Sequence, residues 1–210
     1  MISLDPFYPI VPDTDWLARL LPQGIKLVQL RIKGQDAGVL RAEIEKAVAL
    51  CAAQRCQLVV NDYWREAIIA GASFVHLGQE DLAAADLSAI RAAKIRIGVS
   101  THSHAELEAA LAAEADYVAL GPVYATTLKA MPWPPQGLPR VAEWRSKLNC
   151  PLVAIGGITL ERAPIVLAAG ADSVAVITDI VTSQDPELSA QNWLAATAPW
   201  RNLSTDLPHS

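Results

Sequence analysis

Two aspartates come at the end of short apolar segments or shortly after them. Asp62 ends QLVVND (57–62) and Asp81 ends FVHLGQED (74–81). Carboxylate oxygens suit Mg²⁺, which binds one or two protein carboxylates and completes its shell with water and substrate phosphate oxygens. Each aspartate taken alone could instead cap the helix that follows it. Together they predict a Mg²⁺ site shared with a phosphorylated substrate.

Cations and a glycine pair follow other apolar segments. Arg31, Lys33 and Lys129 can bind phosphoryl groups. The sequence AIGGI at 154–158 offers backbone N–H groups to a phosphate, and Thr159 is expected at the start of the next helix. We therefore expect two anion sites, one bridged by metal and one near the last strands of the chain.

The elements that must position these residues alternate regularly. Helical stretches rich in alanine separate eight apolar runs, namely 7–11, 26–31, 57–61, 74–78, 95–100, 117–121, 151–157 and 173–178. Runs that are apolar throughout are typical of parallel strands with both faces covered. An open flavodoxin-like sheet needs only about five such units. Eight units predict an α/β fold, a single-domain (β/α)8 TIM barrel, whose chemistry lies at the C-terminal ends of its strands.

Several helix starts are marked by capping residues. Asp13 and Thr14 precede apolar residues at helical spacing, and Ser103 with Glu106 forms a capping-box pattern. The apolar spacing of 81–93 predicts one continuous helix. His76 is expected in the packed interior rather than as a metal ligand.

The chain is interpreted as one catalytic domain, 1–200, followed by a frayed tail, 201–210. Segment 125–139 is rich in proline and lacks any period, so we expect a functional loop there, which could act as a lid.

Composition excludes several classes of function. Hydrophobic residues make up 52% and charged residues 19% of the 210-residue chain, which is typical of a globular protein. A net charge of −5 without a basic block argues against nucleic acid as a partner. No apolar run approaches the roughly 20 residues that cross a bilayer, and no signal peptide is expected. Three cysteines without metal-ligand spacing indicate a reduced, cytoplasmic protein. A homo-oligomer is compatible with the sequence.

Eight motifs in order now resemble the thiamine-phosphate synthase family over nearly the whole chain. They are QLRIK (29–33), ND (61–62), HLGQEDL (76–82), GVSTH (98–102), ALGPV (119–123), TxxK (126–129), AIGGI (154–158) and VITDI (176–180). The resemblance implies a Mg²⁺-dependent transferase that forms a C–N bond. It joins 4-amino-2-methyl-5-(diphosphooxymethyl)pyrimidine to a thiazole phosphate and releases thiamine phosphate and diphosphate.

The resemblance also implies the roles of individual residues. The pyrimidine diphosphate would be bound by Gln29, Leu30, Arg31, Ile32, Lys33, Asn61, Ser100 and Lys129. The thiazole phosphate would be bound by Thr126, Thr127, Leu128, Gly157, Ile177 and Thr178. Asp62 and Asp81 would hold Mg²⁺, and Ser100, Lys129 and Asp62 would be catalytic.

The implied mechanism is dissociative, because diphosphate leaves before the thiazole nitrogen attacks. That agrees with a residue set that has cations and metal ligands but no obvious activated nucleophile.

The chain departs from the family pattern at three positions. Leu128 replaces a hydroxyl residue of the usual Pro-Thr-x-Thr-Lys, Thr178 replaces serine, and Asp179 places a carboxylate where a small residue is common. These departures predict weaker binding of the thiazole phosphate.

Three other functions remain open. A thiazole tautomerase shares the barrel but needs no metal–diphosphate site. A binding module without turnover would be consistent with Leu128 and Asp179. A Schiff-base aldolase would need a lysine within a strand, whereas Lys26, Lys33 and Lys129 lie at a strand start or in loops.

Overall fold

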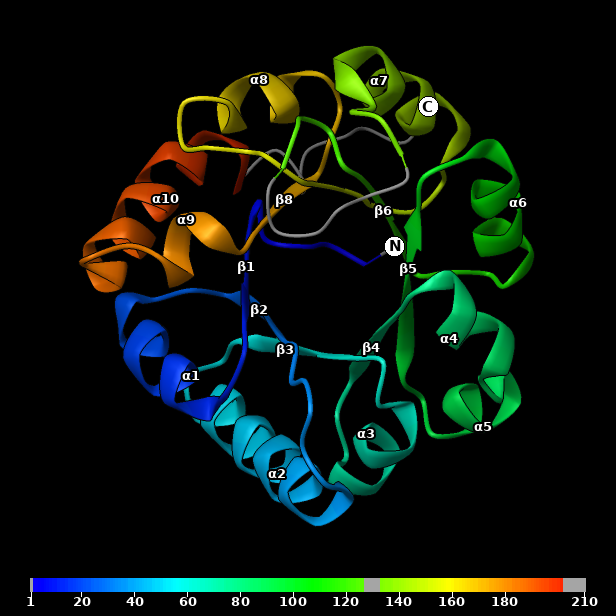
Figure 1. Cartoon of the computed structure of the whole chain (residues 1–210), viewed down its shortest axis with the longest axis vertical. Helices are drawn as coiled ribbons and strands as arrows, with labels where there is room; N and C mark the ends of the chain where they lie inside the picture. The colour runs from blue at the N-terminus through cyan, green and yellow to red at the C-terminus, as the bar shows by residue number, and fades with distance from the viewer. Residues whose placement is uncertain (1, 127–132, 202–210) are drawn as a thin grey trace.

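The computed structural model describes residues 2–126 and 133–201. Eight parallel strands form a closed barrel in sequence order, which confirms the predicted fold class (Figure 1). The strands are β1 Phe7–Val11, β2 Leu27–Leu30, β3 Gln57–Asn61, β4 Phe74–Leu77, β5 Arg96–Thr101, β6 Tyr117–Leu120, β7 Leu152–Ile155 and β8 Ser173–Val176. Pairing of Phe7 with Val174 joins the first strand to the last and leaves no free sheet edge.

Alternation along the strands divides the apolar core in two. One cluster fills the barrel and includes Tyr8, Leu27, Val59, Phe74 and Tyr117. The larger cluster lies between the barrel and the helices. Both faces of the sheet are therefore buried, which explains why the strands read as apolar runs without a polar face.

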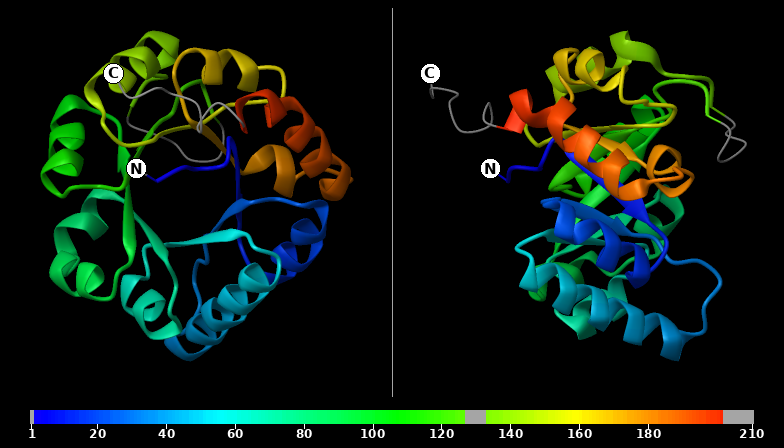
Figure 2. Two further views of the ribbon diagram at one scale, coloured as in Figure 1. Left: turned by 180° about the vertical axis from the view of Figure 1, so that it is seen from behind. Right: turned by 90° about the vertical axis from the view of Figure 1, so that its left-hand side faces the viewer.

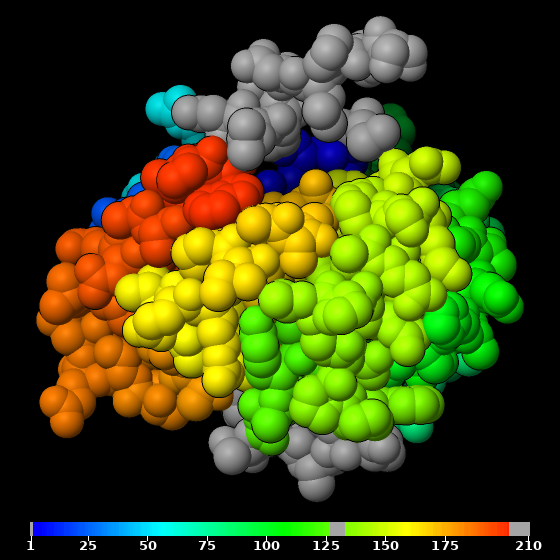
Figure 3. All heavy atoms as spheres, turned by 90° about the horizontal axis from the view of Figure 1, so that it is seen from above, coloured from blue at the N-terminus to red at the C-terminus, as the bar shows by residue number. Residues whose placement is uncertain are grey.

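A ring of helices surrounds the barrel (Figures 1 and 2). The helices are α1 Thr14–Leu20, the 3-10 turn η1 Leu21–Gln23, α2 Ala37–Ala53, α3 Trp64–Ala70, α4 Gln79–Ala84, α5 Leu87–Ala92, α6 His104–Ala112, α7 Gly137–Lys147, α8 Ala163–Ala168, α9 Thr178–Val181 and α10 Pro186–Arg201. On the side seen in Figure 3, the segments containing α7, α8 and α10 pack into a continuous layer. None of the described helices has the length and apolar character required to cross a bilayer.

The single helix predicted over 81–93 is wrong, because two helices occupy this segment. Asp86 lies between α4 and α5, and its carboxylate accepts hydrogen bonds from the amide of Ala89 and the hydroxyl of Ser88. The side chain thus begins a new helix where the apolar period alone suggests continuity. Further along the chain, α7 begins at Gly137, inside the segment 125–139 that lacks any period.

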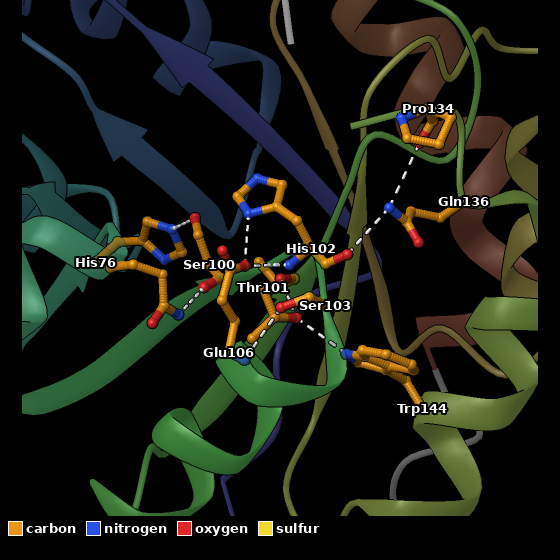
Figure 4. A network of polar contacts seen from close by, with 11 residues as sticks. His76, Ser100, Thr101, His102, Ser103, Glu106, Pro134, Gln136 and Trp144 are labelled. Atoms are coloured by element: carbon orange, nitrogen blue, oxygen red, sulfur yellow. Dashed lines mark hydrogen bonds and ion pairs between the residues drawn. The ribbon is translucent and has the colours of Figure 1, made fainter. Parts of the chain in front are cut away.

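The predicted caps hold at two helices. The Asp13 carboxylate accepts from the amide of Trp16, and the Ser103 hydroxyl accepts from the amide of Glu106. The second half of the capping box differs from the expectation. Glu106 Oε2 accepts from the amide and the Nδ1 of His102, one residue before the cap (Figure 4). Glu106 therefore fixes the chain as it leaves β5.

Candidate active site

Asp62 and Asp81 follow neighbouring strands at the C-terminal end of the barrel, Asp62 directly after β3 and Asp81 in the first turn of α4. Asp62 has a left-handed backbone with φ of 66°, and its amide donates to the carbonyl of His76 at 2.9 Å. The N-caps of the following helices are Tyr63 and Gly78, without a side-chain cap bond at either position. The capping alternative is therefore wrong for both aspartates, whose carboxylates remain available to a ligand.

Asp81 lies close enough to Asp62 to affect the ionisation of the Asp62 carboxyl. Burial first, and then the negative charge of Asp81, raise the pKa of Asp62, which lies at about 6. The positive charge of Arg31 and a hydrogen bond from Asn61 Nδ2, at 2.5 Å, both act to lower the Asp62 pKa. A pair of half-buried carboxylates that repel each other is the arrangement that a divalent cation stabilises.

The donor set fits a hard cation such as Mg²⁺. No cluster of three or more His, Cys, Asp or Glu side chains occurs within residues 2–126 and 133–201. Two carboxylates nevertheless suffice for Mg²⁺, since substrate phosphates and water supply its other oxygens. A cavity of ≈ 280 Å³ opens beside the pair, which is room for several waters or phosphate oxygens. Its lining residues are Asp62, Tyr63, Trp64, Arg65, Glu66, Asp81 and Ala84.

The segment 29–33 divides according to which side of the barrel each residue faces. Gln29 is buried and binds Tyr8 inside the barrel, whereas Leu30 and Ile32 pack into the layer between barrel and helices. The side chains of Leu30 and Ile32 therefore face away from the mouth, and only their backbone could contact a ligand. Arg31 affects the pKa of both Asp62 and His76, so it lies on the site, while Lys33 is exposed.

Ser100 lies near the end of β5 and contacts a buried histidine. The Ser100 hydroxyl and His76 Nε2 are 2.8 Å apart, and Figure 4 shows the imidazole turned toward that hydroxyl. Gln79 Nε2 donates to the Ser100 carbonyl at 2.6 Å, which ties α4 to β5. His76 lies in the interior as predicted, and burial together with the charge of Arg31 lowers its pKa to about 4.

Two tyrosines extend this contact across the barrel, and neither was predicted as part of the site. His76 Nδ1 lies 2.9 Å from the hydroxyl of Tyr117, which lies 3.0 Å from that of Tyr8. Gln29 Nε2 donates to Tyr8 at 2.9 Å. The sequence could have indicated them, because Tyr8 lies in the run of β1 and Tyr117 in the run of β6 and both carry a hydroxyl. They were instead interpreted as apolar residues of those runs. Gln29 and Ser100, both predicted to bind the pyrimidine, thus end one chain of hydrogen bonds.

The second predicted anion site surrounds the glycine pair after β7. Gly157 has φ of 63°, and a Cβ there would lie 2.4 Å from the carbonyl oxygen of Ala125. Only glycine therefore lets the loop after β6 approach this turn. Thr126 belongs to that loop, whereas Thr127, Leu128 and Lys129 lie outside the described residues.

Thr159 does not begin a helix, contrary to the expectation. Its hydroxyl donates to Glu161 Oε2 at 2.7 Å, and α8 starts four residues later at Ala163. The local side-chain bond forms a turn here, so the chain passes through a turn between the glycine pair and α8.

The carboxylate of Asp179 binds the indole of a neighbouring helix. Asp179 Oδ2 accepts from Trp193 Nε1 of α10 at 2.6 Å. Ile177 packs against the interior cluster at the mouth, and Thr178 is exposed. The unusual aspartate thus joins α9 to α10.

Comparisons with known proteins agree with this geometry. A curated thiamine-phosphate synthase of Rhizobium etli is 62% identical over 203 residues, which cover 96% of this chain and 100% of the relative. One of Neisseria gonorrhoeae is 48% identical over 186 residues, 88% of this chain and 91% of the relative. A solved thiamine phosphate pyrophosphorylase from Pyrococcus furiosus has a TM-score of 0.83 at 25% identity, covering 93% of this chain and 96% of that one.

The family match covers the strands that carry the site. It extends over residues 7–180, from β1 to α9, and the family is described as thiamine monophosphate synthase. Asp62, Asp81, Ser100 and Gly157 all fall within it. The chain therefore belongs to the thiamine monophosphate synthase family.

Proposed function

We propose that this member of the family joins 4-amino-2-methyl-5-(diphosphooxymethyl)pyrimidine to a thiazole phosphate, with Mg²⁺ bound by Asp62 and Asp81. The observation that supports the metal is the half-buried carboxylate pair beside Arg31, with the pKa of Asp62 raised to about 6. The relatives' shared name supports the reaction. The bond formed is C–N, between the methylene carbon of the pyrimidine and the thiazole nitrogen.

The reaction proceeds by departure of diphosphate followed by attack of the second substrate. The bond between the methylene carbon and the bridging oxygen breaks, and both electrons leave with diphosphate. The thiazole nitrogen then gives its lone pair to the same carbon, so no proton transfer is required. Positioning and charge stabilisation are the protein's main tasks.

The residues at the pyrimidine diphosphate have distinct tasks. Arg31, Lys33 and Lys129 attract the diphosphate, and Asn61 orients the Asp62 carboxylate through its hydrogen bond. When bound, Mg²⁺ neutralises charge that develops on the leaving group. Ser100, Lys129 and Asp62 act at the reacting centre.

The thiazole phosphate lies across the barrel mouth from the metal. Backbone groups at Gly157 and Ile177, with the segment 126–128 and Thr178, hold its phosphate. Lack of a hydroxyl at Leu128 weakens this binding, so Leu128→Thr lowers the Michaelis constant for the thiazole phosphate. An unchanged constant would show that the missing hydroxyl is unimportant.

The cysteines bear on the cellular compartment, and the C-terminal residues bear on the extent of the catalytic domain. Cys51, Cys56 and Cys150 are free thiols, which supports a reducing compartment such as the cytoplasm. The catalytic domain predicted over residues 1–200 extends by one residue, since Arg201 still belongs to α10, and the tail 202–210 is dispensable for activity.

The test is release of diphosphate from the two substrates with and without Mg²⁺. Wild-type protein should release it only with Mg²⁺, and Asp62→Asn should lower kcat/KM by at least about 100-fold, because one of two metal ligands is lost. Glu80→Gln is the matched control, since Glu80 is an exposed carboxylate next to Asp81. Binding of thiazole phosphate without diphosphate release would favour a tautomerase or a binding module. Turnover without Mg²⁺ would overturn the metal's role.

A further inference from the structure

The barrel interior contains a polar chain whose three middle residues have no part in the proposed reaction. Gln29, Tyr8, Tyr117, His76 and Ser100 are joined by four hydrogen bonds of 2.8 to 3.0 Å. Tyr8 and His76 are 1% and 7% exposed, and Tyr117 is fully buried. Buried phenols and imidazoles need a partner for every proton, so the direction of each bond can be worked out.

The direction follows from the glutamine end. Gln29 Nε2 has only protons to give, so the Tyr8 oxygen accepts there. The Tyr8 proton has one remaining neighbour among the described residues, the Tyr117 oxygen, and must be donated to it. The Tyr117 proton is then left for His76 Nδ1. The opposite direction would leave the Tyr8 proton without an acceptor in the interior, which costs about 1–3 kcal/mol.

The same reasoning fixes the imidazole. Nδ1 of His76 accepts from the Tyr117 hydroxyl and therefore carries no proton, which makes the ring neutral. Its single proton lies on Nε2, which faces the Ser100 hydroxyl at 2.8 Å. Ser100 Oγ accepts this bond, and its own proton stays free for another acceptor.

The strands are built around this arrangement. A Cβ at Gly98 of β5 would lie 2.0 Å from Cζ of Tyr117, so a bare glycine is what lets the ring cross that strand. The imidazole of His76 stacks on the Tyr117 ring, with centroids 5.6 Å apart and planes inclined by 20°. Asn61 pairs with His76, so His76 lies beside β3, the strand that leads into Asp62. The histidine is thus held in position as well as in protonation.

We propose that the Tyr8–Tyr117 pair holds His76 as its Nε2–H tautomer, and that His76 thereby presents Ser100 to the barrel mouth as a hydrogen-bond donor. His76 is a positioning residue that acts through Ser100. The consequence for the ligand rests on the proposed function, in which Ser100 binds the pyrimidine diphosphate. Ser100 then meets an acceptor atom of that substrate, a ring nitrogen or an oxygen.

The tautomer can be measured without any substrate. In ¹⁵N-labelled full-length protein at neutral pH, NMR distinguishes a protonated ring nitrogen from a bare one. The chain has four histidines, and loss of one signal set in His76→Gln identifies that of His76. We expect a proton on Nε2 and none on Nδ1. Tyr117→Phe removes the donor to Nδ1 and should produce a mixture of tautomers. A wild-type protein with the proton on Nδ1 would overturn the proposal.

A double-mutant cycle tests whether His76 acts through Ser100. His76→Leu should lower kcat/KM about tenfold, the effect of one hydrogen bond of roughly 1.4 kcal/mol. His76→Gln should recover most of this, because its amide can donate in place of Nε2. In a Ser100→Ala background, His76→Leu should have no further effect.

The outcomes separate the two proposals. An equal loss from His76→Leu with and without Ser100 would mean a purely structural role and would overturn the positioning role. Absence of turnover in the wild type would refute the proposed function, while the tautomer measurement would still decide the state of His76. Circular dichroism of each variant identifies any that fails to fold, in which case the wild-type and Tyr117→Phe spectra carry the test.

Discussion

Asp62 carries an electrostatic strain that a ligand can relieve. The residue has a left-handed backbone conformation. Its carboxylate is half-buried and lies close to the negative charge of Asp81. A carboxyl whose pKa is raised in the folded state contributes stability below its unfolded pKa and loses that contribution as pH rises through the folded value. For Asp62 the loss falls between the ordinary value of 3.8 and about 6, so the ionised pair destabilises the metal-free protein at neutral pH.

Asp62→Asn should therefore stabilise the metal-free protein at pH 7 while abolishing its response to Mg²⁺. The gain is about 1 kcal/mol once solvent screening of the half-buried pair is allowed for. Urea denaturation in the presence of chelator measures it, and excess Mg²⁺ should then stabilise the wild type but not Asp62→Asn. Glu80→Gln, the exposed neighbour, should still respond to Mg²⁺. An Asp62→Asn protein that gains as much from Mg²⁺ as the wild type would place the metal elsewhere.

His76 contributes to stability with the opposite dependence on pH. Its folded pKa of about 4 lies below the ordinary value of 6.5, so its contribution is present above pH 6.5 and is lost as pH falls toward 4. The difference between the folded and ordinary pKa values of His76 corresponds to about 3 kcal/mol of unfolding free energy. The free energy of unfolding of wild type should therefore fall relative to that of His76→Gln over this range. Parallel curves for the two proteins would show that the histidine is not held neutral.

At the scale of elements, the strands were predictable and their mutual distances were not. Apolar runs identified all eight strands to within a few residues, because burial on both faces leaves a continuous pattern. The approach of Asp62 to Asp81 depends instead on the register that pairs Asn61 with His76, which no local pattern contains. The break between α4 and α5 was missed because the Asp86 side chain accepts a hydrogen bond from the first turn of α5 and so begins a new helix. The spacing of apolar residues alone does not reveal such a local bond.

Gly98 shows how a site inside the barrel depends on the backbone of a neighbouring strand. Gly98→Ala should destabilise the protein by about 3 kcal/mol, because the added Cβ overlaps the buried ring of Tyr117. Adding Tyr117→Leu should recover part of this loss, since the smaller side chain vacates that space. Gly38→Ala in α2 is the control and should be neutral or slightly stabilising, as its Cβ would meet only Asp36 Oδ1 at 3.4 Å. Additive effects at 98 and 117 would contradict the steric account.

At the scale of the whole molecule, contacts between the two ends of the described chain reinforce the closed barrel. The Asp5 carboxylate accepts from Arg201 at 2.7 and 3.0 Å and from the amide of Phe7 at 3.0 Å. The Ser173 hydroxyl donates to the Asp5 carbonyl. The last residue of α10 is thus fixed to the segment that enters β1, beside the seam where β1 pairs with β8.

Arg201→Ala should therefore cost about 2–3 kcal/mol of unfolding free energy, because it leaves the 6%-exposed Asp5 side chain without its cationic partner. Arg19→Ala is the matched control, since the Arg19–Glu187 pair is exposed and worth less than about 1 kcal/mol. Deletion of 202–210 should leave both stability and diphosphate release unchanged, which tests the proposed dispensable tail. Urea denaturation of the three variants measures the changes in stability, and the diphosphate assay measures the activity of the deletion variant. Equal losses from the Arg19 and Arg201 variants would mean that the bond between Asp5 and α10 does no more for the barrel than a surface ion pair does.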